Sequence, residues 1–307
     1  MPVWPEGKRF AFTVFDDPDG QTLEDSRVVY GCLAELGLRT TKGVWPIGPY
    51  REGTSRSESC ENPAYRQHVQ ELQSNGFEIG FHGAALNTSS RERTLAGLNA
   101  FREHFGADPL TMSNHFDNDE GIYFGAHRVS GVRRWIYNAA MLGKHARRYN
   151  GHVPGHPNYW GDACHARIRY CRSFVFRGIN TLTHCPFMPY HDPRRALVHG
   201  WYASSEGANA ALFLGTISEA EQDRLEAEGG ACIMYTHFGK GFCENGVIHP
   251  EFRRLLHRLS ARNGWFVPVS TLLDYLAAQH GLHWLTSRER ARLEWRWLRE
   301  KTMRGSS

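Results

Sequence analysis

The sequence has no apolar run close to the roughly 20 residues that a membrane-spanning helix needs, so we expect no membrane span. The segment 1–6 lacks the apolar core of a secretory signal peptide, which predicts a cytoplasmic protein. There is no C-x-x-C pair, and the seven cysteines are irregularly spaced, which argues against a disulfide framework and a zinc ribbon. No basic block alternates with aromatic residues, and the net charge is only +4, so nucleic acid is not an expected partner.

What is present is an alternation of strand-like and helix-like segments. Together with the absence of an internal repeat or linker, this alternation predicts an α/β protein with a parallel barrel or a doubly wound sheet in a single domain. We expect a barrel over 1–285 with an irregular insertion at about 120–215, and a helical extension over 286–307. The expected strands are 9–15, 40–45, 76–82, 110–113, 169–176, 231–235 and 265–269, and the clearest helices are 25–36, 62–75, 89–105, 250–262 and 270–279.

Three acids follow the first expected strand within four residues. Asp16, Asp17 and Asp19 come directly after the apolar run 10–15, at the strand end where α/β folds build their sites. Crowded carboxylates repel one another and need a metal, a shared proton or a basic neighbour. The alternative interpretation is an acidic turn, because Asp-Pro-Asp-Gly is favourable turn chemistry.

Polar clusters recur at three further strand ends. They are His82 with Asn87, the stretch 114–118, and His237. Any one of these histidines could be an ordinary core or solvated residue, but in a parallel barrel all these ends face one mouth. Asp and His side chains suit zinc and other first-row metals, a second Asp can act as a base, and an opposite His can act as an acid. These are the components of metal-assisted hydrolysis.

The same segments resemble a known family. The run 12–17 is similar to the first motif of the polysaccharide deacetylase (NodB-homology, carbohydrate esterase family 4) superfamily, in which a strand ends in Thr-Phe-Asp-Asp-Gly. Residues 76–82 resemble its second motif, 232–237 its late histidine strand, and 264–276 its closing strand and helix. The resemblance identifies a divergent member. It implies a distorted (β/α)7 barrel and a metal-dependent carbohydrate deacetylase, which hydrolyses a C–N amide bond.

The resemblance also implies roles for single residues. Asp16 would be the general base, and His237 the general acid. Asp17 and His82 would be ligands of a divalent metal. Zinc is the first expectation for this metal, with cobalt, manganese and nickel as alternatives.

The sequence departs from the family pattern around the metal. The family's second histidine, four residues after the first, is replaced here by Leu86, so that the third ligand is either Asn87 or His115. The family's arginine-containing third motif is replaced by the stretch 114–118. Residues 18–19 are inserted before the glycine of the first motif.

The implied reaction removes an acyl group, in the first place N-acetyl, from a sugar in polysaccharide or O-antigen-type glycan biosynthesis. The expected partner is an acylated sugar, a sugar-nucleotide or a lipid-linked glycan. The alternative is a catalytically altered barrel that acts as a carbohydrate-binding or assembly protein, which the Leu86 replacement favours. Candidate substrate-binding residues, each of which could instead serve packing alone, are Asn114, Asp117, Asn118, Arg194 and Trp201.

Overall fold

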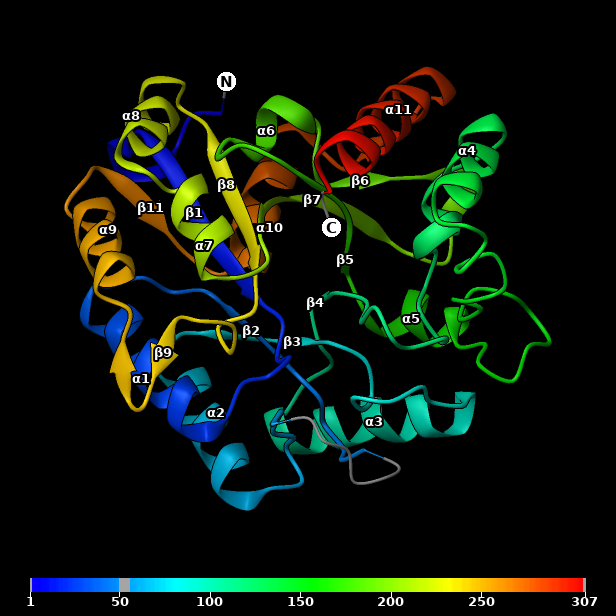
Figure 1. Cartoon of the computed structure of the whole chain (residues 1–307), viewed down its shortest axis with the longest axis horizontal. Coiled ribbons are helices and arrows are strands. Elements are labelled where there is room, and N and C mark those ends of the chain that lie inside the picture. The colour runs from blue at the N-terminus through cyan, green and yellow to red at the C-terminus, as the bar shows by residue number, and fades with distance from the viewer. Residues whose placement is uncertain (1, 50–55, 306–307) are drawn as a thin grey trace.

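The fold is a closed parallel barrel surrounded by helices (Figure 1). The computed structural model describes residues 2–49 and 56–305. Residues 1 and 50–55 of the expected barrel and residues 306–307 of the expected extension therefore lie outside the described residues. The strand β8 pairs with both β1 and β7, which closes the ring. Within the described residues, seven parallel strands form this ring: β1 (Phe10–Asp16), β2 (Thr41–Val44), β3 (Glu78–Phe81), β4 (Thr111–Met112), β5 (Tyr170–Phe176), β7 (Gly200–Gly207) and β8 (Ala231–Thr236). The predicted (β/α)7 barrel in a single domain is confirmed.

The barrel is distorted beside β1. The strand β11 (Gly264–Phe266) pairs with the first half of β1, whereas β2 pairs with β1 only at Phe15 and Asp16. The strand β4 contributes only two residues. The ring is therefore least regular where β2, β3 and β4 begin, and its carboxyl ends still meet at one mouth.

Helices on the outside follow most of the strands, and local sequence signals set their ends. Asn62 caps α2 with Pro63 at its first position, and Ser90 caps α3, which ends at the left-handed Gly106. Thr22 and Asp25 form a capping box on α1. The helices that follow strands of the ring, or β11, are α1 (Leu23–Glu35), α2 (Pro63–Ser74), α3 (Arg91–Phe105), α6 (Thr181–His184), α7 (Ala210–Thr216), α8 (Glu219–Ala227), α9 (Pro250–Ser260) and α10 (Val269–His280).

The alternation along β1 decides which acid faces the barrel. Phe10, Phe12 and Val14 pack in one cluster with side chains of α1 and α9, on the outside of the strand. Phe15 points the other way, and its ring lies 5.5 Å from the Arg172 guanidinium on β5. Because successive side chains of a strand alternate, the next residue, Asp16, returns to the helix side.

The stretch 120–215 holds two strands of the ring, β5 and β7, together with α6 and most of α7. Its other elements are η2 (Gly125–Arg128), α4 (Val132–Ala140), α5 (Gly161–Arg167), β6 (Tyr190–His191) and η3 (Pro193–Arg195). The last helix, α11 (Ser287–Arg304), lies beside α4 and contacts β5 (Figure 1). Its Trp297 packs 5.6 Å from the rings of both Tyr137 and Phe174. The extension is therefore part of the wall around the mouth.

The smaller elements are η1 (Pro5–Gly7), the hairpin of β9 (Cys243–Glu244) and β10 (Val247–Ile248), and β12 (His283–Trp284), which pairs with β6. All seven cysteines are free, in keeping with the absence of a disulfide framework. Among the described helices, none combines the length and the apolar character needed to cross a membrane.

Candidate metal centre and active-site cavity

A cavity of about 330 Å³ opens at the carboxyl ends of the barrel strands. Loops after four strands bring polar side chains to it. Asp17 and Asp19 follow β1, His82 follows β3, His115 follows β4 and His237 follows β8. The predicted convergence of polar strand ends at one mouth is therefore present.

Asp16 does not line this cavity. Its carboxylate accepts hydrogen bonds from the Tyr30 hydroxyl at 3.0 Å and the Phe238 amide at 2.8 Å, and Lys42 Nζ lies 3.2 Å away. Burial raises the pKa of Asp16, against the opposing charge of Lys42. All oxygens of Asp16 are thus engaged on the helix side of β1, as the alternation along the strand requires.

Asp17 is the acid that enters the barrel. Arg172 holds it with two hydrogen bonds, 3.1 Å to Oδ1 and 2.5 Å to Oδ2, and Ser113 Oγ donates to Oδ1 at 2.8 Å. Burial acts to raise the pKa of Asp17, but the charges of Arg172 and His82 outweigh it and lower the pKa. Asp17 is therefore an ionised carboxylate that a buried guanidinium fixes in place.

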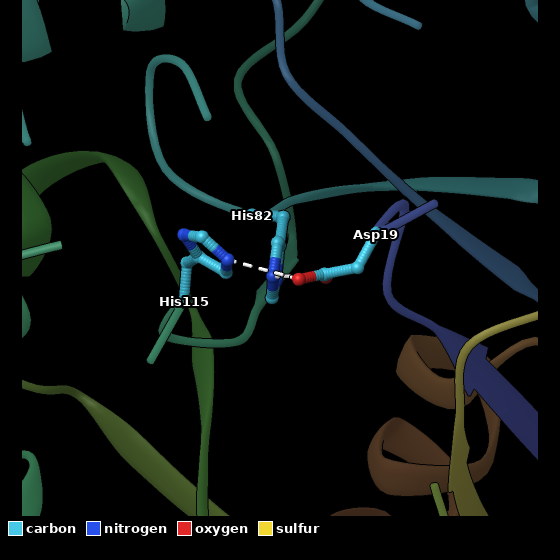
Figure 2. Close-up of side chains that lie close together, drawn as sticks. All are labelled: Asp19, His82 and His115. Atoms are coloured by element: carbon cyan, nitrogen blue, oxygen red, sulfur yellow. Dashed lines mark hydrogen bonds and ion pairs between the residues drawn. The ribbon is translucent and has the colours of Figure 1, made fainter. Parts of the chain in front are cut away.

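Asp19 faces the rings of His82 and His115 (Figure 2). Its Oδ1 lies 2.9 Å from His115 Nε2, and its Oδ2 lies 3.3 Å from His82 Nε2. One ligand atom of each of the three residues falls within 4.8 Å of the others. Burial acts to raise the pKa of Asp19, but the neighbouring imidazole groups of His115 and His82 outweigh this effect and lower the pKa well below its ordinary value.

The far side of each ring fixes which nitrogen faces the centre. Ser113 uses its proton on Asp17, so its oxygen accepts the Nδ1 proton of His82 at 2.6 Å. Asn118 donates its amide protons to Ala85 and Glu120, so its Oδ1 accepts from His115 Nδ1 at 3.0 Å. Both Nε2 atoms are thereby left with a lone pair toward Asp19, which is the arrangement that metal-ligating histidines adopt.

The donor set fits a divalent metal. Two buried atoms, His82 Nε2 and Asp19 Oδ2, have no hydrogen-bond partner although they face each other. Buried polar atoms without a partner are rare and call for an explanation, and a cation between them would supply one. Two imidazole nitrogens and one carboxylate oxygen, with an open position, match a catalytic zinc site.

His237 stands on the other side of Asp19, with its Nε2 3.6 Å from Asp19 Oδ2. Its Nδ1 donates to the Ala208 carbonyl at 2.7 Å, so Nε2 faces the cavity. Burial, together with the charge of Lys240, lowers the pKa of His237 against the opposing effect of Asp17 and Asp19. The ring is oriented to exchange a proton at Nε2.

The other predicted residues divide into two groups. Asn114 and Asp117 line the cavity, and Asn118 acts behind His115. The other three lie outside the cavity lining: Asn87 and Arg194 are exposed, and Trp201 is buried on β7 beside a separate small cavity. Of the two candidates for the third ligand, His115 joins the cluster, whereas Asn87 is exposed and does not line the cavity.

Sequence reasoning missed several residues of the site. Arg172 lies within a mostly apolar strand, which is a signal that it needs a buried acid as its partner. Ser113 directly follows β4, in the position where the other strands place their polar residues. Arg128 and Lys301, which also line the cavity, carry no local signal because their burial depends on how α11 packs.

Comparison with known proteins gives the fold. No protein-family model and no curated protein matches the sequence. A Mycobacterium smegmatis protein assigned to the polysaccharide deacetylases aligns with a TM-score of 0.54 at 13% identity, over 94% of this chain and 96% of that one. A probable polysaccharide deacetylase from Pseudomonas aeruginosa PAO1 aligns with a TM-score of 0.52 at 12% identity, over 91% and 95% of the two chains. Puue allantoinase aligns with a TM-score of 0.51 at 13% identity, over 92% and 95%. The resemblance inferred from the motifs is thus confirmed at the level of the fold: the chain has the NodB-type barrel of polysaccharide deacetylases.

Proposed function

We propose that this protein is a metal-dependent hydrolase that removes an acyl group, in the first place N-acetyl, from a sugar. The observation that carries the proposal is the convergence of Asp19, His82 and His115, with Asp17 and His237 beside them, in one cavity of a NodB-type barrel. This set offers a metal site, a base and an acid within reach of one another, which amide hydrolysis requires.

The proposed metal ligands are Asp19, His82 and His115, with zinc preferred and cobalt, manganese or nickel as alternatives. A bound metal would polarise the acyl oxygen and lower the pKa of a water molecule. Relative to the family motif, the ligand role moves from Asp17 to Asp19. The geometry favours this shift because Arg172 and Ser113 already occupy the oxygens of Asp17.

Asp17 is then the proposed general base. Arg172 keeps it ionised, so it can accept a proton from the water that attacks the acyl carbon. Asp16 is an unsuitable base because its oxygens contact Tyr30, Lys42 and the Phe238 amide outside the cavity.

His237 is the proposed general acid. After water attacks the amide, the C–N bond breaks and the leaving nitrogen needs a proton, which His237 Nε2 can deliver once the ring is protonated. The Ala208 carbonyl holds Nδ1, so the ring keeps Nε2 toward the cavity. The products are an amine and a carboxylate.

For the substrate, we propose an acylated sugar, a sugar-nucleotide or a lipid-linked glycan of polysaccharide or O-antigen-type biosynthesis, processed in the cytoplasm. Asn114 and Asp117 line the cavity and can contact its hydroxyl groups. We keep Arg194 and Trp201 out of this contact set because both lie away from the cavity lining.

Metal content and turnover of matched variants test the proposal. The parent protein should bind one zinc per chain and release acetate from N-acetylated sugars. Asp19→Ala and His115→Ala should lose the metal, whereas Asn87→Ala should keep it. Asp17→Asn should keep the metal and lose turnover. A parent that takes up no metal, or an Asp17→Asn variant that loses it, would contradict the assignment.

The second candidate, a carbohydrate-binding or assembly protein, rests on Leu86 in place of the family's second histidine. It predicts a parent protein with glycan affinity but without turnover under any metal. Unchanged glycan affinity after Asp19→Ala, in a parent without turnover, would favour it over the hydrolase.

A further inference from the structure

The cavity has a second polar wall that the hydrolysis does not use. Arg128, at the end of η2, and Lys301, near the end of α11, line the same cavity as the metal candidates. Arg128 is only 8% exposed, and its Nε has no hydrogen-bond partner. Among the described residues, neither side chain makes a hydrogen bond or an ion pair.

This lack of partners is unlike the other buried arginines of the fold. Arg172 pairs with Asp17, and Arg195 pairs with both Asp192 and Glu294. Buried charges are normally paired in this way because an unpaired charge loses its hydration without compensation. The contacts recorded for the Arg128 guanidinium in the described part of the chain are aromatic, at 3.9 Å from the Phe124 ring centroid and 5.2 Å from that of Trp297.

The two cations also repel each other. Burial lowers the pKa of Lys301 to about 8, and the charge of Arg128 adds to this effect, whereas the charge of the buried Glu206 on β7 opposes it without offsetting it. Burial lowers the pKa of Arg128 to about 10. Two poorly hydrated cations at one cavity wall create a positive electrostatic potential, which would attract an anion into the cavity.

The acids of the cavity do not supply that anion. Asp17 is neutralised by Arg172, and Asp19 faces two histidines. Asp117 is exposed at the rim, where water solvates it. The exposed Lys240 adds further positive charge to the lining.

We propose that Arg128 and Lys301 form an anion subsite that binds a carboxylate or phosphate of the substrate while its acyl group lies at Asp19, His82 and His115. The substrate class thereby narrows to acidic acylated sugars, such as an N-acetyl sugar phosphate or an N-acetyl sugar with a carboxylate substituent. The cavity of about 330 Å³ is in the range of small-ligand sites, so one molecule can reach both walls. The identity of the acyl sugar rests on the proposed function, but the anion subsite itself does not.

Calorimetry on metal-free protein, prepared with a chelator, tests the subsite without turnover. The probes are N-acetylglucosamine, N-acetylglucosamine 6-phosphate and N-acetylmuramic acid, which carry no anion, a phosphate and a carboxylate. We expect at least one acidic probe to bind about tenfold or more tightly than the neutral sugar, because a charged hydrogen bond is worth about a factor of ten or more. The preferred acidic probe distinguishes phosphate from carboxylate.

Arg128→Gln and Lys301→Met should each abolish most of this preference and leave binding of the neutral sugar within about twofold. Arg288→Gln, which removes an equal charge from the exposed surface of α11, is the matched control and should keep the preference. Because Lys301 is only half-buried and makes no hydrogen bond or ion pair among the described residues, Lys301→Met tests the subsite if Arg128→Gln does not fold. Equal affinity for acidic and neutral probes in the parent, or an unchanged preference in Lys301→Met, would overturn the subsite. A clear preference in a protein without turnover would instead refute the hydrolase and leave the subsite standing.

Discussion

Lys42→Met tests the interpretation that Asp16 is an interior group, outside the cavity that we propose as the active site. Both side chains are fully buried, and Lys42 Nζ lies 3.2 Å from Asp16 Oδ2. At an effective dielectric constant of about 20, an ion pair at this distance is worth about 5 kcal/mol before desolvation. Removing one partner of a buried pair typically costs about 3–5 kcal/mol, a large share of the total stability of a domain.

The cost should depend on pH. Burial already raises the pKa of Asp16, and without Lys42 the pKa rises further. A carboxyl group with a raised pKa in the folded state destabilises the protein only above its unfolded pKa, and fully above its folded pKa. The loss in Lys42→Met should therefore be small near about pH 4 and largest at about pH 8.

Urea unfolding followed by circular dichroism at several pH values measures this loss. The double variant Asp16→Asn/Lys42→Met removes both charges, keeps an acceptor oxygen for the Phe238 amide and places an amide nitrogen where it can donate to the Tyr30 oxygen. It should recover more than half of the stability lost in Lys42→Met. A loss that is equal at all pH values, or a double variant as unstable as the single one, would refute the reasoning.

Other substitutions separate stability from chemistry. Asp16→Asn should keep turnover per folded molecule within about threefold. Asp17→Asn should lower kcat about 10²–10⁴-fold, which is the usual contribution of a general base. A loss of that size in Asp16→Asn would instead support Asp16 as the base, the role implied by the motif. Ser113→Ala removes the acceptor for His82 Nδ1 and should weaken zinc affinity about 10–100-fold, measured by chelator competition. Glu294→Ala removes an acid that contacts Arg195 at 2.9 Å and should lower stability by about 3 kcal/mol. Burial acts to raise the pKa of Glu294 but the arginine outweighs it, so the parent's advantage should be present at neutral pH and lost as the pH falls below about 4.5.

The sequence was sufficient for the barrel because the apolar strands and the polar residues at their ends are local patterns. Apolar runs mark β1, β3 and β8, and each is followed by the acid or histidine that reaches the mouth. The strand β7 carries Ser204, Ser205 and Glu206 among its buried residues, so its polar sequence does not resemble a barrel strand. Its place in the ring follows from pairing with β5 and β8, which are distant in sequence.

The roles of the three acids needed a different kind of reasoning. Aligning Asp16 and Asp17 with the Asp-Asp pair of the family motif makes them the base and the ligand, whereas the roles that we propose from the geometry fall to Asp17 and Asp19. The alternation of side chains along β1 shows which way Asp16 points. Because Phe10, Phe12 and Val14 face the helices, Asp16 faces them too. The third ligand could not be chosen in this way, because His115 reaches Asp19 only through the meeting of two loops.

The position of Lys301 at the cavity could not be predicted from the sequence. It lies in a helix of mostly charged residues, where a lysine is ordinarily a solvated surface group. Only the packing of α11 against the barrel, through Trp297 beside Tyr137 and Phe174, brings it to the cavity wall next to Arg128. The same packing places two sets of groups in the cavity: the acids with Arg172 and the histidines on one wall, and on the other wall two cations that make no hydrogen bond or ion pair among the described residues. A ligand that complements this cavity must therefore carry a negative charge at one end and present its reacting carbonyl group at the other.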